Sequence, residues 1–447
     1  MIKKHIFRFL LALTGKYSMD QFTEIERINN PEGLENLEKK YLEKLLLHAY
    51  HNIPFYSELL EKFGVVRKNE ADLNRFDTFP LLTKDIIRNH RRGLTSKDID
   101  KRKWYYNSSG GSTGEPVRLI QDHSFDKWMN ATLRLYYENM VGIDELGAKK
   151  VLLWGSERDI LEGTVGLKEK VSNWLTNTVF LNSFKMTERD MERYVKIVNS
   201  YKPDLIRGYA GSLYEFCKFV EGRKLSIHSP RMVVSSAENL RDEMRIKIEQ
   251  VFATRVYNFY GSREVGAIAG ECRYGSLHIF MFNNYTEVTD KVGMPVGENT
   301  EGRIIVTNLH NYSMPLIRYN IGDMAVSGSE KCKCGNPLPT LKKITGRITD
   351  HFVREDGTII YGEYFTHLFY LKDWVKAFQI VQEDYKKVRV FVVLFRNHVD
   401  KFEKREIENG IKSVMGQDCV VVWEIVEQMP ETQSGKHLYT KSLVHPA

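Results

Sequence analysis

The sequence predicts an α/β protein with a large N-terminal domain and a small α+β domain at the C-terminus. Its 447 residues exceed the length of one typical domain. Between residues 151 and 235, short apolar runs alternate with segments of helical spacing, which is typical of a layered α/β core. After Gly346 the pattern changes to a hairpin, strands and a charged helix. We therefore place residues 1–347 in the first domain and residues 348–447 in the second.

The first domain is expected to begin with helices. Apolar residues recur at helical spacing over residues 35–62, and Pro54 interrupts them, so two helices are predicted there. Thr83 follows a proline-containing turn and is expected to cap another helix. Buried parallel strands and helices are then expected to alternate, over Val151–Trp154, Glu188–Val198, Ser212–Glu221 and Arg231–Ser235.

Strands punctuated by glycine and proline are expected later in the chain. Glu301–Asn308 and Met314–Tyr319 look like antiparallel strands. A hairpin is predicted over Phe352–Ile360, turning at Gly357. A helix, two strands, a charged helix and a last strand should follow it, over Phe365–Leu371, Ala377–Gln382, Lys387–Phe395, Asp400–Met415 and Cys419–Val426.

The composition is that of an ordinary soluble protein, with 42% hydrophobic and 28% charged residues. The net charge of +7 is small for this length and does not indicate a nucleic-acid partner. Five cysteines are too few for a disulfide framework and suit a reducing cytoplasm. The apolar run Met1–Leu13 is too short to span a bilayer. We expect it to form a terminal helix packed on the body, with peripheral membrane contact as the alternative.

The densest chemical signal is the run Asn107-Ser-Ser-Gly-Gly-Ser-Thr-Gly-Glu-Pro116. Small residues let the backbone approach an anion, and successive N–H groups with hydroxyls form a concave phosphate nest. The run lacks the Gly-Lys-Ser/Thr ending of a P-loop, so it is a different phosphate loop. The alternative is a flexible linker, although Tyr105 and Tyr106 precede it like the end of a strand. Its phosphate-binding residues would be Ser108, Ser109, Gly110, Gly111, Ser112, Thr113 and Gly114.

Four further motifs follow this loop in order, namely Tyr260-Gly-Ser-Arg-Glu264, Arg318-Tyr-Asn-Ile-Gly-Asp323, Gly346-Arg-Ile-Thr-Asp350 and Ser434-Gly-Lys436. Together the five resemble the motif series of the adenylate-forming superfamily, which contains acyl-CoA synthetases, peptide-synthetase adenylation domains and luciferases. Within it, Leu46–Tyr56 and Phe79–Lys84 look like the phenylacetate–CoA ligase family, and most like its capsular-polysaccharide branch. The resemblance extends from about residue 35 to residue 443.

The resemblance implies an N-terminal domain of α/β layers with a β-barrel-like part, and a mobile C-terminal lid. It also implies activation of a carboxylic acid by ATP, which requires neutralised phosphate charge and a bound magnesium ion. Glu264 matches the magnesium-binding carboxylate, and Asp323 matches the aspartate that bonds the ribose. Lys436 matches the mobile catalytic lysine, and Arg347 the arginine beside the hinge. The adenine pocket would be lined by Ser236, Ala237, Glu238 and Tyr260, the last stacking on the ring.

Each of these residues also has an ordinary reading. Glu264 and Asp323 could be surface carboxylates, and Lys436 a solvated lysine, although the ordered series favours function. Two positions depart from the superfamily. Arg263 stands where threonine or serine is usual and could pair with substrate or phosphate, and Thr349 stands at the hinge where aspartate is commoner.

The acid and its acceptor are harder to infer. Trp154, Arg207, Tyr209 and Arg263 are expected in the substrate pocket, and their character favours a polar acid over a fatty acid. Residues 356–369 replace the turn with which coenzyme A ligases of this family line the thioester half-site. Gly362 would hold the equivalent turn, and His367 could be the base for an incoming thiol or amine, or a structural helix-face histidine.

Four residues form a second constellation, namely Cys272, His278, Cys332 and Cys334. Three thiolates and one imidazole are a closed set that suits structural zinc. Such a site would clip the 270–278 loop to the 331–335 loop. The alternative is reduced cysteines without metal, because this split spacing is weaker than paired Cys-x-x-Cys motifs.

The sequence therefore predicts a cytoplasmic or membrane-peripheral AMP-forming ligase that binds ATP, Mg²⁺ and structural zinc. It would pass the acyl group of a small-molecule acid to coenzyme A or to an amine, in surface polysaccharide biosynthesis. One alternative is an amide ligase that joins a sugar acid or polysaccharide precursor to an amine without coenzyme A. Another is a non-catalytic nucleotide-binding accessory protein, against which the presence of Lys436 and Glu264 argues.

Overall fold

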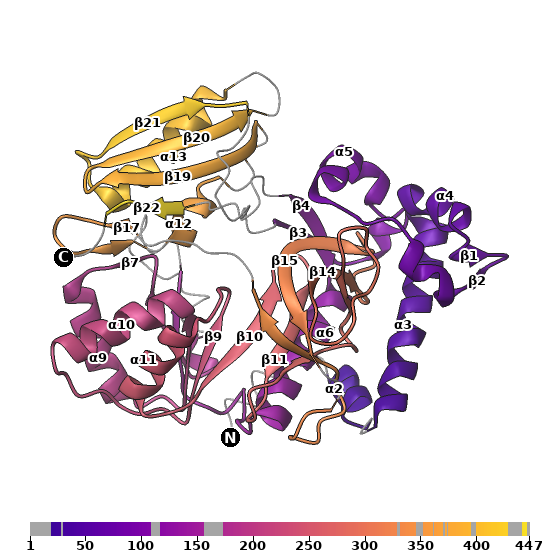
Figure 1. Ribbon diagram of the computed structural model, residues 1–447, viewed down its shortest axis with the longest axis horizontal. Helices are drawn as coiled ribbons and strands as arrows, with labels where there is room; N and C mark the ends of the chain where they lie inside the picture. The colour runs from indigo at the N-terminus through magenta and orange to yellow at the C-terminus, as the bar shows by residue number, and fades with distance from the viewer. Residues whose placement is uncertain are drawn as a thin grey trace.

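The computed structural model describes residues 19–27, 30–108, 117–155, 173–328, 331–345, 352–360, 362–369, 372, 374–394, 399–427 and 440–444. Its centre is an 11-stranded mixed sheet in the order β13-β14-β15-β16-β12-β11-β10-β9-β8-β5-β6 (Figure 1). The expected α/β class, with a large sheet domain and a small C-terminal domain, is confirmed.

One half of the sheet is parallel. Its strands are β5 (Lys150–Trp154), β6 (Thr178–Asn182), β8 (Leu205–Tyr209), β9 (Met232–Ser236) and β10 (Val256–Ser262). The connecting helices cover one face and are α9 (Glu188–Tyr201), α10 (Ala210–Gly222) and α11 (Asp242–Phe252). Side chains alternate along a strand, so Ile206 packs with these helices whereas Leu205 belongs to the core on the opposite face. The alternation of strands and helices predicted between residues 151 and 235 is confirmed.

The other half of the sheet is antiparallel. Its strands are β11 (Gly266–Glu271), β12 (Leu277–Ile279), β13 (Asn284–Thr289), β14 (Glu301–Asn308), β15 (Tyr319–Ser327) and β16 (Thr340–Ile344). The bend between β10 and β11 requires glycine, because a Cβ on Gly261 would lie 2.5 Å from the carbonyl oxygen of Gly266. The sheet therefore changes direction at the motif that carries Glu264.

The strand predicted over Met314–Tyr319 is wrong, because β15 begins only at Tyr319. Pro315 has no N–H to give to a ladder, and Arg318 has a φ of +47°, in the left-handed region outside the range of regular strands. The segment instead packs beneath the N-terminal helices, where the hydroxyl of Tyr56 donates to the carbonyl oxygen of Pro315 at 3.1 Å.

The N-terminal helices lie beside the antiparallel half (Figure 1). The expected break at Pro54 and the cap at Thr83, whose side chain accepts from the N–H of Ile86, are both present. The helices are α2 (Met19–Glu26), α3 (Pro31–Asn52), α4 (Pro54–Lys62), α5 (Lys84–Leu94) and α6 (His123–Leu135), with short turns η1 (Leu73–Thr78), η2 (Ile99–Lys101) and η3 (Tyr136–Met140). Two hairpins accompany them, β1 (Val66–Arg67) with β2 (Glu70–Ala71) and β3 (Trp104–Ser108) with β4 (Arg118–Asp122).

The C-terminal part has its own four-stranded sheet, in the order β21-β20-β19-β22. Its elements are α12 (Gly362–His367), β19 (Val375–Asp384), β20 (Lys387–Leu394), α13 (Lys401–Met415), β21 (Val420–Ile425) and β22 (Thr440–Ser442). The helix expected over 365–371 begins three residues earlier, at Gly362. The predicted hairpin is present as β17 (Phe352–Val353) and β18 (Ile359–Ile360), with Gly357 at a φ of +77°.

The two parts of the chain share a sheet and a core. Strand β18 pairs with β7 (Lys185–Met186) of the N-terminal part. Phe184 and Tyr209 of that part pack with Phe352, Ile360 and Tyr364 of the C-terminal part, the rings of Phe184 and Tyr364 lying 5.7 Å apart. The expected domain boundary at residue 347 lies outside the described residues and stays a prediction.

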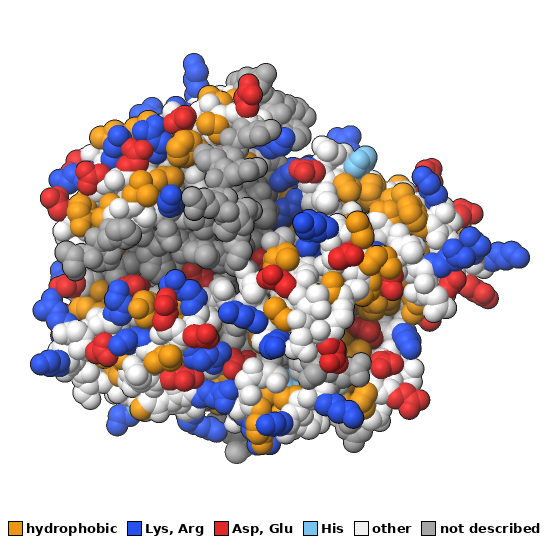
Figure 2. Space-filling model, viewed as in Figure 1, with side chains coloured by type: hydrophobic (Ala, Val, Ile, Leu, Met, Phe, Trp, Pro, Cys, Tyr) orange, Lys and Arg blue, Asp and Glu red, His pale blue; other side chains and the backbone are white. Residues whose placement is uncertain are grey.

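The surface agrees with the modest net charge. On the face seen in Figure 2, basic and acidic side chains are interspersed. No helix in the described ranges is long and apolar enough to cross a membrane. The terminal helix expected over residues 1–13 lies outside these ranges.

Candidate active site

A cavity of about 300 Å³ lies at the carboxyl ends of the parallel strands β5, β8 and β9 and along β10. Ligands of open α/β sheets bind at this edge, because the strands end there in loops free to carry polar groups. The structure brings ten of the predicted site residues to this one cavity, namely Trp154, Arg207, Tyr209, Ser236, Ala237, Glu238, Tyr260, Arg263, Glu264 and Asp323.

Two residues expected on the nucleotide side are hydrogen-bonded to each other. The Tyr260 hydroxyl on β10 donates to Oδ2 of Asp323 on β15, at 2.7 Å. Since the two residues are 63 positions apart, the bond fixes the ring and the carboxylate against each other across the sheet. Both stay partly exposed and line the cavity, so either can meet a ligand.

The loop after β9 has a special backbone. Ala237 has a φ of +66°, so the chain turns sharply as it leaves the strand. Glu238 then accepts a hydrogen bond from the N–H of Gly211 at 2.7 Å, in the first turn of α10. Its carboxylate is therefore a helix cap as well as part of the cavity wall.

Glu264 is the buried carboxylate of the cavity, with 5% of its surface exposed. The Tyr319 hydroxyl donates to its Oε1 over a long 3.4 Å. Gln121 on β4 donates to the backbone carbonyls of Arg263 at 2.7 Å and Glu264 at 3.2 Å. Asn107 on β3 donates to Gln121 Oε1 at 2.7 Å. The stem of the expected phosphate loop is thus bonded to the segment that carries Glu264.

The sequence reasoning missed Gln121 and Asn258. Gln121 is buried in a strand that contains no recognised motif, and the carbonyl groups to which it donates lie more than 140 residues away. Asn258 lines the cavity two positions before Tyr260, and that closeness was the available signal.

Of the two expected acceptor-side residues in the C-terminal part, His367 lies beside Arg263, which lines the cavity. Nη2 of Arg263 lies 3.4 Å from Nε2 of His367, at the end of α12. The ring of Phe184 meets the His367 ring edge-on at 4.9 Å. Gly362 is the first residue of the same helix. The remaining predicted site residues, Ser109–Gly114, Arg347 and Lys436, lie outside the described residues, whereas Ser108 ends β3.

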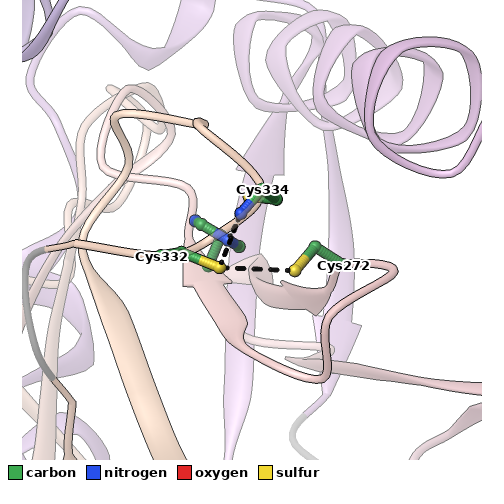
Figure 3. Close-up of side chains that lie close together, drawn as sticks. Cys272, Cys332 and Cys334 are labelled. Atoms are coloured by element: carbon green, nitrogen blue, oxygen red, sulfur yellow. Dashed lines mark hydrogen bonds between the residues drawn. The ribbon is translucent and has the colours of Figure 1, made fainter.

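The predicted cysteine constellation is assembled in three dimensions (Figure 3). The ligand atoms of Cys272, His278, Cys332 and Cys334 all lie within 4.8 Å of one another. The sulfur atoms of Cys272 and Cys332 are 3.7 Å apart, and Cys334 Sγ is 3.2 Å from His278 Nε2. These separations match one tetrahedral ion better than a disulfide framework.

The surroundings of this cluster fit a metal. Nδ1 of His278 lies 3.0 Å from the carbonyl oxygen of Leu338, so Nε2 faces the sulfurs. Burial lowers the pKa of His278, which keeps the imidazole in its neutral, metal-binding form. Backbone N–H groups of Tyr274, Cys334 and Asn336 point at the three sulfur atoms, as thiolates require.

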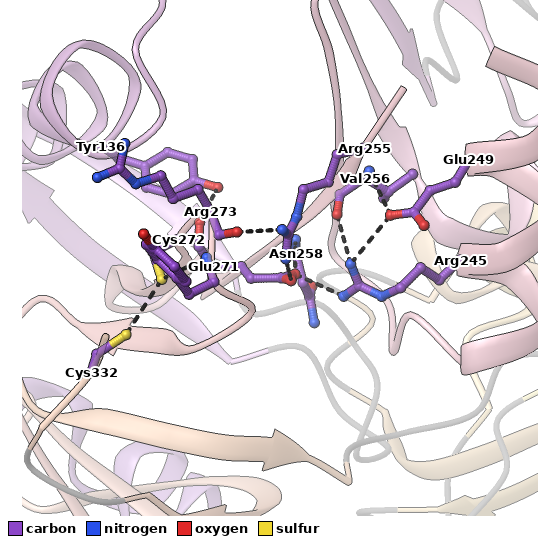
Figure 4. A network of polar contacts seen from close by, with 11 residues as sticks. Tyr136, Arg245, Glu249, Arg255, Val256, Asn258, Glu271, Cys272, Arg273 and Cys332 are labelled. Atoms are coloured by element: carbon purple, nitrogen blue, oxygen red, sulfur yellow. Dashed lines mark hydrogen bonds and ion pairs between the residues drawn. The ribbon is translucent and has the colours of Figure 1, made fainter. Parts of the chain in front are cut away.

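A polar network joins this cluster to the cavity wall (Figure 4). Glu271 precedes Cys272 and is almost fully buried. Its carboxylate accepts from Arg245 at 2.7 Å and from the backbone N–H of Asn258 at 2.8 Å, and it pairs with Arg255 at 3.4 Å. Since Asn258 lines the cavity, the cluster and the cavity share one rigid support.

Comparisons with known proteins agree with this geometry. A family model described as the CapK C-terminal domain matches residues 352–442. Protein CapK of Staphylococcus aureus is 25% identical over 95% of this chain and 93% of its own length. A phenylacetate–coenzyme A ligase of Thermus thermophilus is 26% identical over 78% of each chain. The solved structure of 2-hydroxyisobutyryl-CoA ligase in a postadenylation state shares the fold, with a TM-score of 0.56, 16% identity and coverage of 92% of this chain and 89% of its own.

The chain is therefore similar in sequence to protein CapK and to phenylacetate–coenzyme A ligases, and it shares the fold of 2-hydroxyisobutyryl-CoA ligase. The predicted enzyme class, an AMP-forming ligase, agrees with these relatives. The family model coincides with the C-terminal part that carries α12 and His367. The roles of the individual cavity residues stay predictions.

Proposed function

We propose that the protein condenses a carboxylic acid with ATP at this cavity, forming an acyl-adenylate and releasing pyrophosphate. The observation that carries the proposal is the meeting of Tyr260, Asp323 and Glu264 at one edge of the parallel sheet. An aromatic face, a ribose acceptor and a buried hard carboxylate are the groups that a magnesium nucleotide needs.

Each group has a proposed task. Tyr260 would stack on adenine, with Ser236, Ala237 and Glu238 beside it, while Asp323 would accept from the ribose hydroxyls. Glu264 would hold a magnesium ion, which when bound neutralises phosphate charge. Residues 108–114 would bind the phosphates, anchored through Asn107 and Gln121 to the Glu264 segment. Lys436 and Arg347 keep the roles implied by the resemblance, as catalytic lysine and hinge arginine.

The second half-reaction would pass the acyl group to a thiol or an amine. The phenylacetate–coenzyme A ligases among the relatives support coenzyme A as the thiol. His367 would take the proton of the incoming nucleophile, because it reaches the cavity edge beside Arg263. An amide ligase acting on a sugar acid remains the alternative. The similarity to protein CapK supports a role in capsule polysaccharide synthesis.

We further propose that Cys272, His278, Cys332 and Cys334 hold a structural zinc ion. All four positions are protein ligands, so the site has no open position for catalysis. Metal analysis of the purified protein should find one zinc per chain, and Cys334→Ser should lose it while ATP binding persists. Wild-type protein without zinc would refute the assignment.

Acid-dependent exchange of labelled pyrophosphate into ATP tests the central proposal. Wild type should exchange with at least one acid of a panel that includes aryl, aliphatic and sugar acids. Glu264→Gln should reduce exchange about 100-fold or more, with Glu243→Gln, an exposed glutamate of α11, as the matched control. ATP binding without exchange for any acid would instead favour the accessory-protein alternative. AMP release driven by coenzyme A or by amines then separates the two ligase readings.

A further inference from the structure

One cation of the cavity, Arg207, has no ion-pair partner among the described residues. Arg207 lies on β8 and lines the cavity. Its guanidinium carbon is 5.3 Å from the ring centre of Trp154 and 5.2 Å from that of Phe259. The Trp154 ring is in turn stacked on Tyr209, with ring centres 4.4 Å apart. Aromatic rings therefore hold the guanidinium and keep water from it.

The protein offers this guanidinium little polar compensation. Within the described ranges, no carboxylate lies within 4 Å of its nitrogens. Nη2 reaches Ser236 Oγ at 3.5 Å, the long limit of a hydrogen bond. The buried Tyr137 is a second polar neighbour: burial raises the pKa of its hydroxyl, and the nearby Arg207 opposes that rise. Nε is buried and has no hydrogen-bond partner among the described residues. A half-buried charge in this state costs free energy unless a ligand supplies the missing acceptors.

The acidic residues of the same cavity form no ion pair with Arg207 among the described residues. Glu238 accepts from the N–H of Gly211, and Asp323 accepts from the Tyr260 hydroxyl. Glu264 lies near Tyr319, on the segment that Gln121 holds. These carboxylates belong to residues proposed to bind the nucleotide, whereas the Arg207 guanidinium lies between the rings of Trp154 and Phe259.

We propose that Arg207 binds a second anionic group of the acid substrate. The substrate class is then a carboxylic acid with two negative groups, one carboxylate being activated while the other anion bonds Arg207. The inference rests on the proposed adenylation. A guanidinium presents in-plane N–H groups that match a carboxylate bidentately, and partial dehydration strengthens that bond. An acid with an apolar end would leave Arg207 unpaired, so the site rejects it.

Matched acid pairs test the proposal in the pyrophosphate-exchange assay. The pairs are glutarate with valerate, benzene-1,3-dicarboxylate with benzoate, and glucarate with gluconate. At least one dianion should exceed its monoanionic partner about tenfold or more in kcat/KM. Arg207→Met should lower kcat/KM for that dianion at least about 30-fold and for its partner less than about threefold. Arg207→Lys should retain part of the preference for the dianion, because the ammonium group keeps the positive charge but cannot form the bidentate bond of a guanidinium.

The control variant is Arg231→Met, which removes one exposed arginine outside the cavity and should leave the preference unchanged. Equal losses of Arg207→Met on both members of a pair, or no dianion preference in wild type, would overturn the proposal while adenylation stands. Calorimetry measures the binding of the dianions in the presence of an ATP analogue that cannot be cleaved between its α- and β-phosphates. This measurement tests the anion site at Arg207 separately from adenylation. Binding that depends on Arg207 without exchange would refute adenylation and retain the anion site. If Arg207→Met leaves the binding of every dianion unchanged, the anion site is refuted.

Discussion

Arg207 and Arg318 both lie inside the N-terminal part, and the protein treats them differently. All five N–H donors of Arg318 are used, two on Glu287 at 2.8 and 3.1 Å and the others on the carbonyls of Asp77, Phe79 and Gly293. Arg207 has two aromatic neighbours, one long bond and a buried Nε without a partner among the described residues.

The difference separates a structural arginine from a proposed binding arginine. Arg318 joins the segment before α5 to strand β13 and to the turn at Gly293 that follows this strand, so it links two regions far apart in sequence. Its charge is satisfied by the fold, so no ligand is needed. Aromatic rings hold the guanidinium of Arg207 in place, and no carboxylate among the described residues pairs with it. A preorganised binding site requires such a fixed group, whose hydrogen-bond acceptors come from the ligand.

Arg318→Met should show the largest effect on stability. It leaves Glu287 buried and unpaired, and breaking such a pair costs about 3–5 kcal/mol. Urea unfolding measures the loss, with Arg231→Met as the exposed control. The double variant Arg318→Met/Glu287→Leu should recover at least half of it, because both charges are then absent. A shift below about 1 kcal/mol in the single variant would show that the pair is not structural.

Glu271→Gln should cost less, about 1–3 kcal/mol, because an amide keeps hydrogen-bonding capacity but leaves Arg245 and Arg255 without their anion. Glu243→Gln serves as the exposed control in the same urea titration. The variant should also weaken ATP binding, since Glu271 holds the backbone of Asn258 at the cavity wall. Unchanged unfolding and unchanged ATP affinity together would remove the link between cluster and cavity.

A third arginine, Arg102, gives a smaller effect that depends on pH. The hydrogen bonds that Arg102 and Ser96 donate to Asp98 lower the pKa of this carboxyl to about 2, although its partial burial acts in the opposite direction. A lowered folded-state pKa contributes stability above the unfolded pKa and loses it as pH falls through the folded one. The contribution should be about 1 kcal/mol after screening, lost between about pH 4 and pH 2. Asp98→Asn should flatten the acid limb of stability against pH, and an identical limb would exclude Asp98 as its source.

Arg207→Met should change stability least, by less than about 1 kcal/mol, and in the direction of greater stability. Replacing an uncompensated half-buried charge by an apolar side chain removes a cost and keeps the contacts with Trp154 and Phe259. The unfolding midpoint in urea checks it. A loss comparable with that of Arg318→Met would mean that Arg207 is structural as well.

Local chemistry made several features predictable. Pro54 ends one helix and starts the next, Thr83 caps α5, and Gly357 turns the C-terminal hairpin, each through its own backbone preference. The cluster of Cys272, His278, Cys332 and Cys334 was also predictable, because thiol and imidazole side chains in one small set suit metal binding. The strand expected over Met314–Tyr319 failed because the buried bonds of Arg318 override the apolar pattern there.

By itself, the sequence indicated the alternation of strands and helices between residues 151 and 235, the motif series and the class of enzyme. These features depend on residue type and spacing along the chain, which are known before the fold is. Only the tertiary structure decided which groups meet. Gln121 donates to the backbone carbonyl of Glu264, and Glu271 accepts from the backbone N–H of Asn258. The fold also decides that the charge of Arg318 is paired, whereas Arg207 has a long bond to Ser236 and no ion-pair partner among the described residues. The reason is physical, because the state of a buried charge depends on partners that the fold brings from distant parts of the chain, and no local pattern encodes them.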